Sequence, residues 1–396
     1  MDFLSSVEDS LSSVQDSMSA VMDFLSIPAS VRRDGAVITM NEAAILVTLL
    51  AALVSFFVYV FGGYHGAAKP LHARDPSLPP PSEVIGLRVY PIKSCRGIQV
   101  DRVRITKQGL DLDRNWMFID AEKKKFLTIR AKSNMTLINT KFSDDYSELI
   151  ISITGSPDEV RIATRPTQEW LKENCTLDQA EIWEGPTDVW LYGDDVNAMF
   201  SKHLGKAVKL AYKGPNPRLA GGSASEELYG KKTSFMFADL MHVQIASEAS
   251  LQDINRRLLE NKADCEQLTI ERFRPNIIIK GNEPWEEDRW KKVQIVVLDH
   301  AKEQLRRYNF DVVCRCARCH VPDVHPDTGV ASKKFEPYKT LMSFRNIDKG
   351  GPAAQKPCFG MLCIPQNEGD IWIGNKLEAL EMTDKHLYNT TKFSDL

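Results

Sequence analysis

The most regular hydrophobic pattern lies near the start of the chain. Residues 5–25 read SSVEDSL, SSVQDSM and SAVMDFL, a seven-residue unit repeated three times. Apolar residues alternate at spacings of three and four, which places them on one face of a helix. Serine is a mediocre helix former, so this helix would need self-association or a membrane surface for stability. A mostly disordered acidic tail with an accidental repeat is the alternative interpretation.

A second apolar segment runs from Ala43 to Gly63 and contains 21 residues without a charge. At the helical rise it would span roughly 30 Å, the thickness of a bilayer core. A signal peptide would have a shorter apolar region closer to Met1. The pattern therefore predicts an uncleaved single-pass transmembrane helix, and basic residues on both sides leave its orientation open. The stretch DPSLPPPSE, residues 75–83, predicts an extended spacer after it.

From Val84 onward, short apolar runs typical of β-strands predominate. The expected strands are 85–90, 103–106, 116–119, 149–154, 189–192, 276–280, 293–298 and 370–374, and the expected helices are 166–175, 194–205 and 247–260. Strands and helices do not alternate regularly, as they would in a doubly wound sheet. We therefore expect an α+β, strand-rich fold in two mixed domains that meet near residues 215–240.

Composition excludes some classes of function. With 396 residues the chain has room for two or three domains. The net charge of -3 gives no sign of the positive excess that duplex binding needs, so we expect no nucleic-acid partner. Eight cysteines are too few for a disulfide scaffold in a chain of this length, which suits a reducing compartment.

Three of the cysteines lie in the stretch CRCARCHVP, residues 314–322. Cys316, Cys319 and His320 match the attachment pattern of c-type haem, but the β-rich surroundings argue against haem. Zinc would usually draw ligands from two separated loops, and no second pair is seen. Inert loop thiols are a third possibility, but the two flanking arginines would stabilise a thiolate. One thiolate bound to a soft metal that a cofactor otherwise holds fits better.

Basic residues occur in tight local contexts elsewhere in the chain. YPIKSCRGI places Lys93 and Ser94 in a turn after a strand, LDRNWMF places Arg114 just before a strand, and FRPNIII does the same with Arg274 and Asn276. Scattered arginines are usually solvated surface residues. Arginine at strand ends can also bind a phosphate bidentately. Together these residues suggest an anionic cofactor near the thiol cluster.

These motifs, with CARC followed by HPDTGV, resemble the MOSC family, specifically the membrane-anchored mitochondrial amidoxime-reducing components and their bacterial iron-sulfur relatives. The resemblance covers roughly residues 84–380 in order. It implies a molybdenum pyranopterin (molybdopterin) cofactor. The expected organisation is an N-terminal heptad segment (1–42), a transmembrane helix (43–63), a linker (64–83), a β-barrel-like MOSC N-terminal domain (84–215) and a MOSC β-barrel domain (216–385).

The resemblance also assigns roles to single residues. It implies that Cys319 ligates molybdenum, that Cys319 and Asp239 are catalytic, and that Cys316 is the loop cysteine that does not bind the metal. A haem-like spacing would then be coincidence. The cofactor-binding residues that it implies are Lys93, Ser94, Arg114, Arg274, Asn276, Ala317 and Arg318.

One departure from the family pattern concerns residues 239–242. Similar chains read Asp-Thr-Ser-Pro before the next strand, whereas this chain reads Asp-Leu-Met-His. The two hydroxyl groups that would contact the pterin are therefore absent. Backbone groups could replace them, or Thr233 and Ser234 could supply hydroxyls if the loop is shifted.

By this resemblance the chain is expected to reduce N-hydroxylated compounds such as amidoximes and hydroxylamines. No Rossmann glycine fingerprint or second cofactor domain is apparent, so electrons would come from partners, which the resemblance names as a b-type cytochrome and its NADH-dependent reductase. It places the protein in the outer mitochondrial membrane, with the catalytic domain facing the cytosol. A non-catalytic molybdenum-cofactor or sulfur carrier is the alternative, and a membrane-tethered structural zinc protein is a third.

Overall fold

The computed structural model describes residues 75–396, except residues 184, 264–265, 300–302, 349–353, 387–393 and 395. The chain divides into two units, Met1–Arg74 and Asp75–Leu396, of which the second is described. The predicted heptad segment, the predicted anchor at 43–63 and most of the linker therefore lie outside the described residues. Within the described part, none of the helices combines the length and the apolar character that crossing a bilayer requires.

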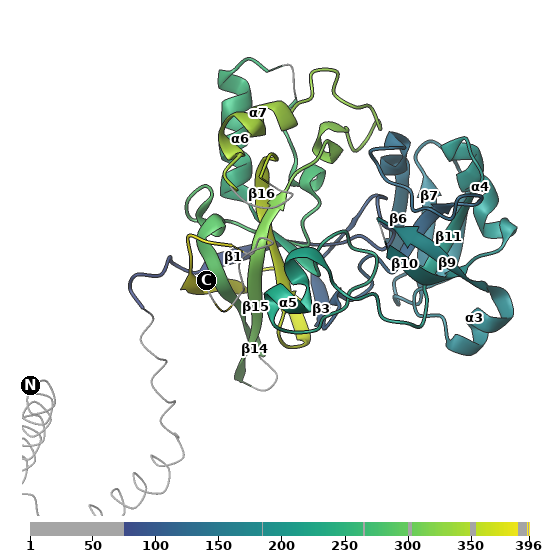
Figure 1. Cartoon of the computed structure of the whole chain (residues 1–396), viewed down its shortest axis with the longest axis horizontal. Coiled ribbons are helices and arrows are strands. Elements are labelled where there is room, and N and C mark those ends of the chain that lie inside the picture. Colours follow the sequence, from purple (N-terminus) through teal and green to yellow (C-terminus); the bar gives the residue numbers. More distant parts are fainter. Residues whose placement is uncertain are drawn as a thin grey trace, which may run out of the picture. The chain divides into compact units, whose positions relative to one another are not determined.

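Eight strands form the largest sheet: β1 (Ser82–Val89), β2 (Ile98–Val100), β12 (Val243–Ser247), β13 (Ile277–Ile279), β14 (Trp290–Asp299), β15 (Gln304–Ala317), β16 (Cys358–Pro365) and β18 (Lys376–Met382). Their order is β13-β12-β16-β15-β14-β18-β1-β2, and β1 also pairs with β13. This pairing closes the first seven strands into a barrel (Figure 1). Neighbours in the ring are antiparallel, apart from the parallel pair β12 and β13.

Two helices cover one side of the barrel. Strand β16 reads CFGMLCIP and is buried along its whole length, so both of its faces are covered. Helices α6 (Glu248–Glu260) and α7 (Tyr338–Arg345) supply the outer cover, and Leu251, Ile254 and Leu341 belong to one buried cluster with Phe359 of β16. Ser247, the last residue of β12, caps the N-terminus of α6, and its hydroxyl accepts a hydrogen bond from the backbone N–H of Ser250.

The N-terminal part contains smaller sheets. A four-stranded antiparallel sheet contains β5 (Trp116–Asp120), β11 (Val208–Lys213), β10 (Gly185–Leu191) and β9 (Thr176–Ile182), in that order. A three-stranded sheet contains β6 (Ile138–Phe142), β7 (Glu148–Ile153) and β8 (Glu159–Ala163). A second three-stranded sheet contains β17 (Gly369–Trp372), β3 (Arg102–Thr106) and β4 (Gly109–Leu110). In this sheet β17, from the C-terminal part of the chain, pairs with β3, from the N-terminal part. The remaining elements are α3 (Gln168–Asn174), α4 (Asp194–Leu204), α5 (Glu226–Tyr229), η1 (Ser133–Leu137), η2 (Gly222–Ala224), η3 (Ile270–Phe273), η4 (Glu286–Arg289) and η5 (Val321–Asp323).

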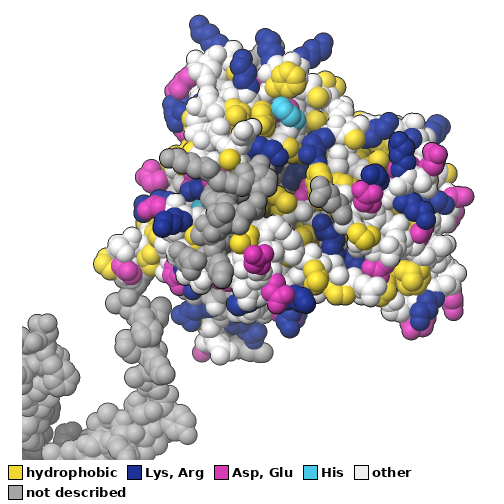
Figure 2. Space-filling model, viewed as in Figure 1, with side chains coloured by type: hydrophobic (Ala, Val, Ile, Leu, Met, Phe, Trp, Pro, Cys, Tyr) yellow, Lys and Arg dark blue, Asp and Glu magenta, His cyan; other side chains and the backbone are white. Residues whose placement is uncertain are grey.

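The strand-rich fold and its barrel confirm the fold class predicted for this part of the chain, whereas the predicted transmembrane helix has no support in the described residues. Strands β15, β16 and β18 were not predicted. Strand β1 is a member of the barrel even though it begins the range 84–215 that was expected to form a domain of its own. Basic and acidic side chains are interspersed over the face drawn in Figure 2, in line with the small net charge of -3.

Candidate functional site

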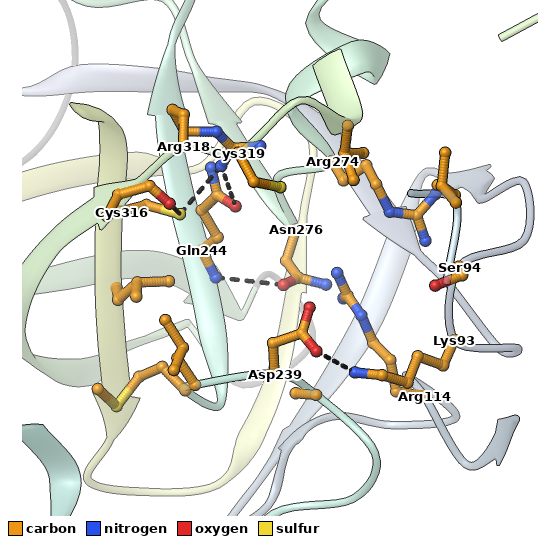
Figure 3. A pocket seen from close by; sticks show the side chains of 17 residues that line it. Lys93, Ser94, Arg114, Asp239, Gln244, Arg274, Asn276, Cys316, Arg318 and Cys319 are labelled. Carbon is orange, nitrogen blue, oxygen red and sulfur yellow. Dashed lines mark hydrogen bonds and ion pairs between the residues drawn. The ribbon is translucent and has the colours of Figure 1, made fainter. Parts of the chain in front are cut away.

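One pocket brings the predicted site residues together. Its walls come from the turn after β1, the turn before β5, the loop before β12, the residues before β13, and the end of β15 with the residues that follow it. The empty space measures about 830 Å³, with open solvent at the mouth included. The thiol of Cys319 enters from one side, and the side chains of Lys93, Arg114 and Arg274 enter from the other (Figure 3). All nine predicted residues line this pocket: Lys93, Ser94, Arg114, Asp239, Arg274, Asn276, Ala317, Arg318 and Cys319.

The cysteines of CRCARCHVP do not form one loop, contrary to the interpretation of them as loop thiols. Cys314 and Cys316 are buried in β15, which ends at Ala317, whereas Cys319 follows the strand and is partly exposed. His320 contacts Asp323 at 2.7 Å and does not line the pocket. Among the residues that the structure describes, no group of three His, Cys, Asp or Glu side chains is placed to share a metal ion. A site in which protein groups alone hold zinc therefore finds no support here.

The two arginines that flank these cysteines, Arg315 and Arg318, form hydrogen bonds to groups other than Cys319. Arg315 donates to the carboxylate of Asp348 at 2.6 Å. Arg318 donates to the sulfur of Cys316 at 2.9 Å and to the carbonyl oxygen of Phe273 at 3.0 Å. Burial raises the pKa of the Cys316 thiol, and the Arg318 charge opposes this only in part. Of the two flanking arginines, Arg318 therefore favours the thiolate of Cys316, and Arg315 pairs with Asp348.

Lys93 lies at the opposite wall and is almost fully buried, with 4% of its surface exposed. Its ammonium group donates to the carbonyl oxygen of Phe237 at 2.8 Å and to the carboxylate of Asp239. Burial lowers the pKa of Lys93 to about 8, although Asp239 favours the charged form. The Asp239 side chain is 57% exposed, and although loss of water around its carboxylate would raise the pKa, the charges of Lys93 and two nearby arginines outweigh this and lower it. The indole N–H of Trp183 also donates to Asp239, at 3.2 Å.

Two guanidinium groups lie over one buried aromatic ring. Arg114 and Arg274 are 4.4 Å and 4.3 Å from the centre of the Tyr90 ring. Arg114 is also paired with the buried carboxylate of Asp113, and Arg274 donates to the carbonyl oxygen of Cys95 at 2.7 Å. A planar cation stacked on a ring and bonded at its edge keeps few rotamers. These arginines are therefore held in position before any ligand binds.

Three of the pocket residues have left-handed backbone conformations that side chains rarely adopt. The φ angles are +67° at Ser94, +54° at Arg114 and +56° at Arg274. Such conformations cost roughly 1–3 kcal/mol each and persist only where the surroundings fix them. At Arg114 the backbone N–H donates to the carbonyl oxygen of Tyr90 at 2.8 Å, and at Arg274 it donates to that of Glu271 at 3.0 Å. Because three strained backbone positions line the same pocket, we infer that the function of the pocket requires these backbone conformations.

The side chain of Asn276 is bound to the backbone of two barrel strands. It accepts a hydrogen bond from the backbone N–H of Gln244 in β12 and donates to the carbonyl oxygen of Arg88 in β1, both at 3.2 Å. Gln244 also lines the pocket and accepts a hydrogen bond from Arg318 at 3.4 Å. Sequence reasoning missed Gln244, although a lone amide in the apolar run VQIA was a usable signal.

The pocket wall next to Asp239 is apolar at Leu240 and Met241. Leu240 and Met241 line the pocket, whereas Thr233 and Ser234 do not, so the hypothesis that a shifted loop supplies their hydroxyls is not supported. Met241 is buried, and Leu240 is 54% exposed. The side-chain hydroxyl that does line the pocket belongs to Ser94.

The chemistry of this donor set fits a molybdenum pterin cofactor. A partly exposed thiol can serve as one soft ligand, and three cationic side chains, with the hydroxyl of Ser94, can bind an anionic group. The Nε of Arg318 is buried beside the pocket without a hydrogen-bond partner in the described part of the chain. A ligand acceptor could satisfy such a donor.

Comparisons with known proteins agree with this geometry. Residues 82–207 match the family described as the MOSC N-terminal beta barrel domain, and residues 232–378 match the MOSC domain. Mitochondrial amidoxime-reducing component 1 of Mus musculus is 30% identical over 75% of this chain and 82% of that protein, and the protein of that name from Homo sapiens is 31% identical with the same coverage. Molybdenum cofactor sulfurase of Oryza sativa subsp. japonica is 27% identical over 84% of this chain and 39% of that protein.

Proposed function

The chain belongs to the MOSC-domain family, and we propose that it is a molybdenum-cofactor-dependent reductase of N-hydroxylated compounds such as amidoximes and hydroxylamines. Its relatives include amidoxime-reducing components and molybdenum cofactor sulfurases, which support a function related to the molybdenum cofactor. The observation that carries the proposal is a single pocket in which the Cys319 thiol faces Lys93, Arg114 and Arg274.

We infer that the two walls of the pocket bind different parts of the cofactor. Cys319 would ligate the metal, while Arg114, Arg274 and Lys93 would bind the anionic part of the pterin. Tyr90 and Asp113 already orient the two arginines, so little side-chain freedom remains to be lost on binding. A site prepared in this way binds more tightly than one that must order mobile arginines.

When bound, the cofactor would supply two-electron reduction and a position that accepts the oxygen of the substrate. Reduction of an N-hydroxyl group to the N–H compound and water consumes two electrons and two protons. Lys93 holds a proton at neutral pH with a pKa of about 8, and it hydrogen-bonds Asp239, whose side chain is 57% exposed at the pocket. This pair would hold a proton beside the reacting group, with Asp239 accepting hydrogen bonds from the substrate.

Partners and location are part of the same proposal. Electrons would come from a b-type cytochrome and its NADH-dependent reductase, because the sequence shows no Rossmann glycine fingerprint and no second cofactor domain. The names of the relatives support a mitochondrial location. Anchoring to the outer membrane with the catalytic part facing the cytosol would raise the effective concentration of all three proteins.

A non-catalytic cofactor or sulfur carrier is the second candidate. The match to a molybdenum cofactor sulfurase, which covers 84% of this chain but 39% of that protein, favours it specifically. A carrier would bind the cofactor in the same pocket but would not turn over an amidoxime repeatedly.

The test compares the full chain with Cys319→Ala, after expression in cells that make the cofactor. Molybdenum and pterin content, circular dichroism and turnover of an amidoxime with a chemical electron donor are measured for each. We expect the parent to contain both and to turn over, and Cys319→Ala to keep its fold while losing molybdenum and activity. Cys175→Ala, at the end of α3 and outside the pocket, is the matched control.

Three results are decisive. Normal turnover by Cys319→Ala would refute the proposal. Cofactor without multiple turnovers in the parent would identify a carrier. Zinc without pterin would show that the pocket holds a different group.

A further inference from the structure

An exposed aromatic cluster lies beside the cofactor pocket, on the chain that follows Cys319. The ring of His320, the next residue, lies 4.1 Å from the ring of Tyr338 and 5.6 Å from the ring of Phe335, measured between ring centres. The His320 side chain is 53% exposed, and Phe335 is 59% exposed. None of these three residues lines the pocket, so the cluster is a surface next to the cofactor site and not a part of it.

The two exposed rings of this cluster are held in place. The Nδ1 of His320 hydrogen-bonds the buried carboxylate of Asp323 at 2.7 Å. Phe335 has a left-handed φ of +57°, and its carbonyl oxygen accepts a hydrogen bond from the backbone N–H of Lys339 at 2.8 Å. A strained backbone at a bulky residue persists where function requires it, and here it presents an apolar ring to solvent. Rigid aromatic side chains lose little conformational freedom when a partner covers them.

Lysine side chains surround the cluster. Helix α7 and the turn before it contain four basic residues, Lys333, Lys334, Lys339 and Arg345, and one acidic residue, Glu336. Arg345 and Glu336 are buried, with 4% and 6% of their surfaces exposed. The exposed charges of this segment are therefore those of its three lysines.

The exposed acidic residues near this surface already have partners. Asp327 pairs with Arg96 at 2.6 Å, and Glu266 contacts His325 at 3.1 Å. Figure 2 shows Lys and Arg side chains gathered at the end of the molecule where Figure 1 draws α6 and α7. A chain whose net charge is -3 thus carries a local positive surface beside its candidate metal ligand.

An apolar centre within a basic rim is the pattern of an interface for an acidic protein. We propose that this surface is where an acidic one-electron carrier protein docks, with the edge of its cofactor against His320 and Phe335 and its carboxylates near the three lysines. The inference rests on the proposed reductase function, which requires an outside electron donor, and deepens it by assigning the surface that receives the donor.

The position of the surface suits electron delivery. His320 is bonded directly to Cys319, so a docked carrier lies beside the inferred metal ligand without using the residues that line the pocket. Each encounter oxidises one carrier by one electron. Two encounters therefore supply the two electrons that reduction of one N-hydroxyl group to the N–H compound and water consumes. Interfaces of this transient kind are small, which fits a few aromatic and lysine side chains.

The experiment measures binding of a purified one-electron carrier to the cofactor-loaded full chain by calorimetric titration. The probe is the oxidised, soluble haem domain of an acidic b-type cytochrome, and a basic c-type cytochrome is the comparison. We expect the acidic cytochrome alone to bind, with an affinity that falls steeply as salt is added, because exposed charges are screened. Phe335→Ala, and Lys333→Glu combined with Lys334→Glu, should each weaken this binding about tenfold.

Controls on α3 carry the same kinds of side chain at another place. Trp170→Ala removes a ring that is 39% exposed, and Lys172→Glu reverses an exposed charge, so neither should change binding. Amidoxime turnover with a chemical electron donor should be unchanged in the Phe335 and lysine variants, whereas turnover driven by the reduced cytochrome should fall in proportion to binding. That difference would show that fold and cofactor are intact.

The outcomes separate this surface from the reductase function. Equal binding of both cytochromes, or binding that either the Phe335 variant or the lysine variant leaves unchanged, would overturn the inference. Attachment of the chain to anionic phospholipid vesicles with neither cytochrome bound would overturn it as well, since the lysines would then serve a membrane. Lack of amidoxime turnover by the parent with the chemical donor would refute the reductase proposal alone, and salt-dependent binding that is lost in the variants would still support the docking surface.

Discussion

Replacing Lys93 by Met should separate the stability of the protein from its function. Lys93 is 4% exposed, and burial lowers its pKa from the usual 10.5 to about 8. The folded protein therefore holds this proton more weakly than the unfolded chain does. Between pH 8 and 10.5 the unfolded state binds more protons, so the contribution of Lys93 to stability rises with pH in that window. Below pH 8 the buried charge reduces stability by a constant amount.

The size of the effect follows from the two pKa values. At about 1.4 kcal/mol for each pH unit, the full contribution is roughly 3 kcal/mol, of which about 2.5 kcal/mol would be recovered between pH 7 and 10. Lys93→Met removes the titrating group and keeps an unbranched side chain of similar length. The difference in unfolding free energy between parent and variant should therefore change by about this amount over that range.

The assay is chemical denaturation of cofactor-free protein at several pH values between 7 and 10. Lys125→Met is the control, because that side chain is 59% exposed and its ammonium remains in water after folding. A parent-to-variant difference at Lys93 that stays flat with pH would refute the reasoning. Cofactor content measured on the same variant should fall, which would show that the pocket keeps a destabilising charge for the sake of its ligand.

Two other substitutions test the supports of the site. Asp113→Asn keeps an acceptor for the backbone N–H of Tyr90 but removes the charge paired with Arg114. Chemical denaturation should show an unfolding free energy lower by about 3 kcal/mol, and metal analysis should show weaker molybdenum retention. Gly281 has a φ of +76°, and Gly281→Ala would place a Cβ 2.1 Å from the hydroxyl of Ser247. We expect this substitution to lower the unfolding free energy, measured by chemical denaturation, by more than about 2 kcal/mol. Gly155→Ala, at a φ of +82° with no atom within 4 Å, should cost less, and equal losses would contradict the steric argument.

Strands whose burial alternates could be predicted from the sequence, and so could the short apolar runs of β5 and β13, although both are buried at every position. Strand β7 reads ELIISI and alternates between partly exposed and buried positions, so its two faces are visible in the sequence. Strand β16 is buried on both faces and shows no such alternation. Strand β15 begins QLRR with four exposed positions and owes its conformation to pairing with β14 and β16. Its strand character therefore depends on tertiary contacts that a local pattern does not contain.

The sequence identified which residues line the candidate site, but it did not show how their side chains are arranged there. The motifs around Lys93, Arg114, Arg274 and Cys319 do line one pocket, although only the family resemblance related them to one another. The sequence could not show that Arg318 faces Cys316. It also gave no sign of Trp183, because a single aromatic residue near a turn acquires meaning only when the fold brings Asp239 beside it.

The membership of β1 in the barrel has a consequence for how the chain can be assembled and divided. Val84 in β1 pairs with Ile279 in β13, so β1 cannot form this pairing until a segment almost 200 residues later has been synthesised. Most of the N-terminal part is thus an insertion between one barrel strand and the rest. A fragment beginning at residue 216 would leave the edges of β13 and β18 open, and open edges promote aggregation. Closure over so long a separation should also make barrel formation a late step on the ribosome.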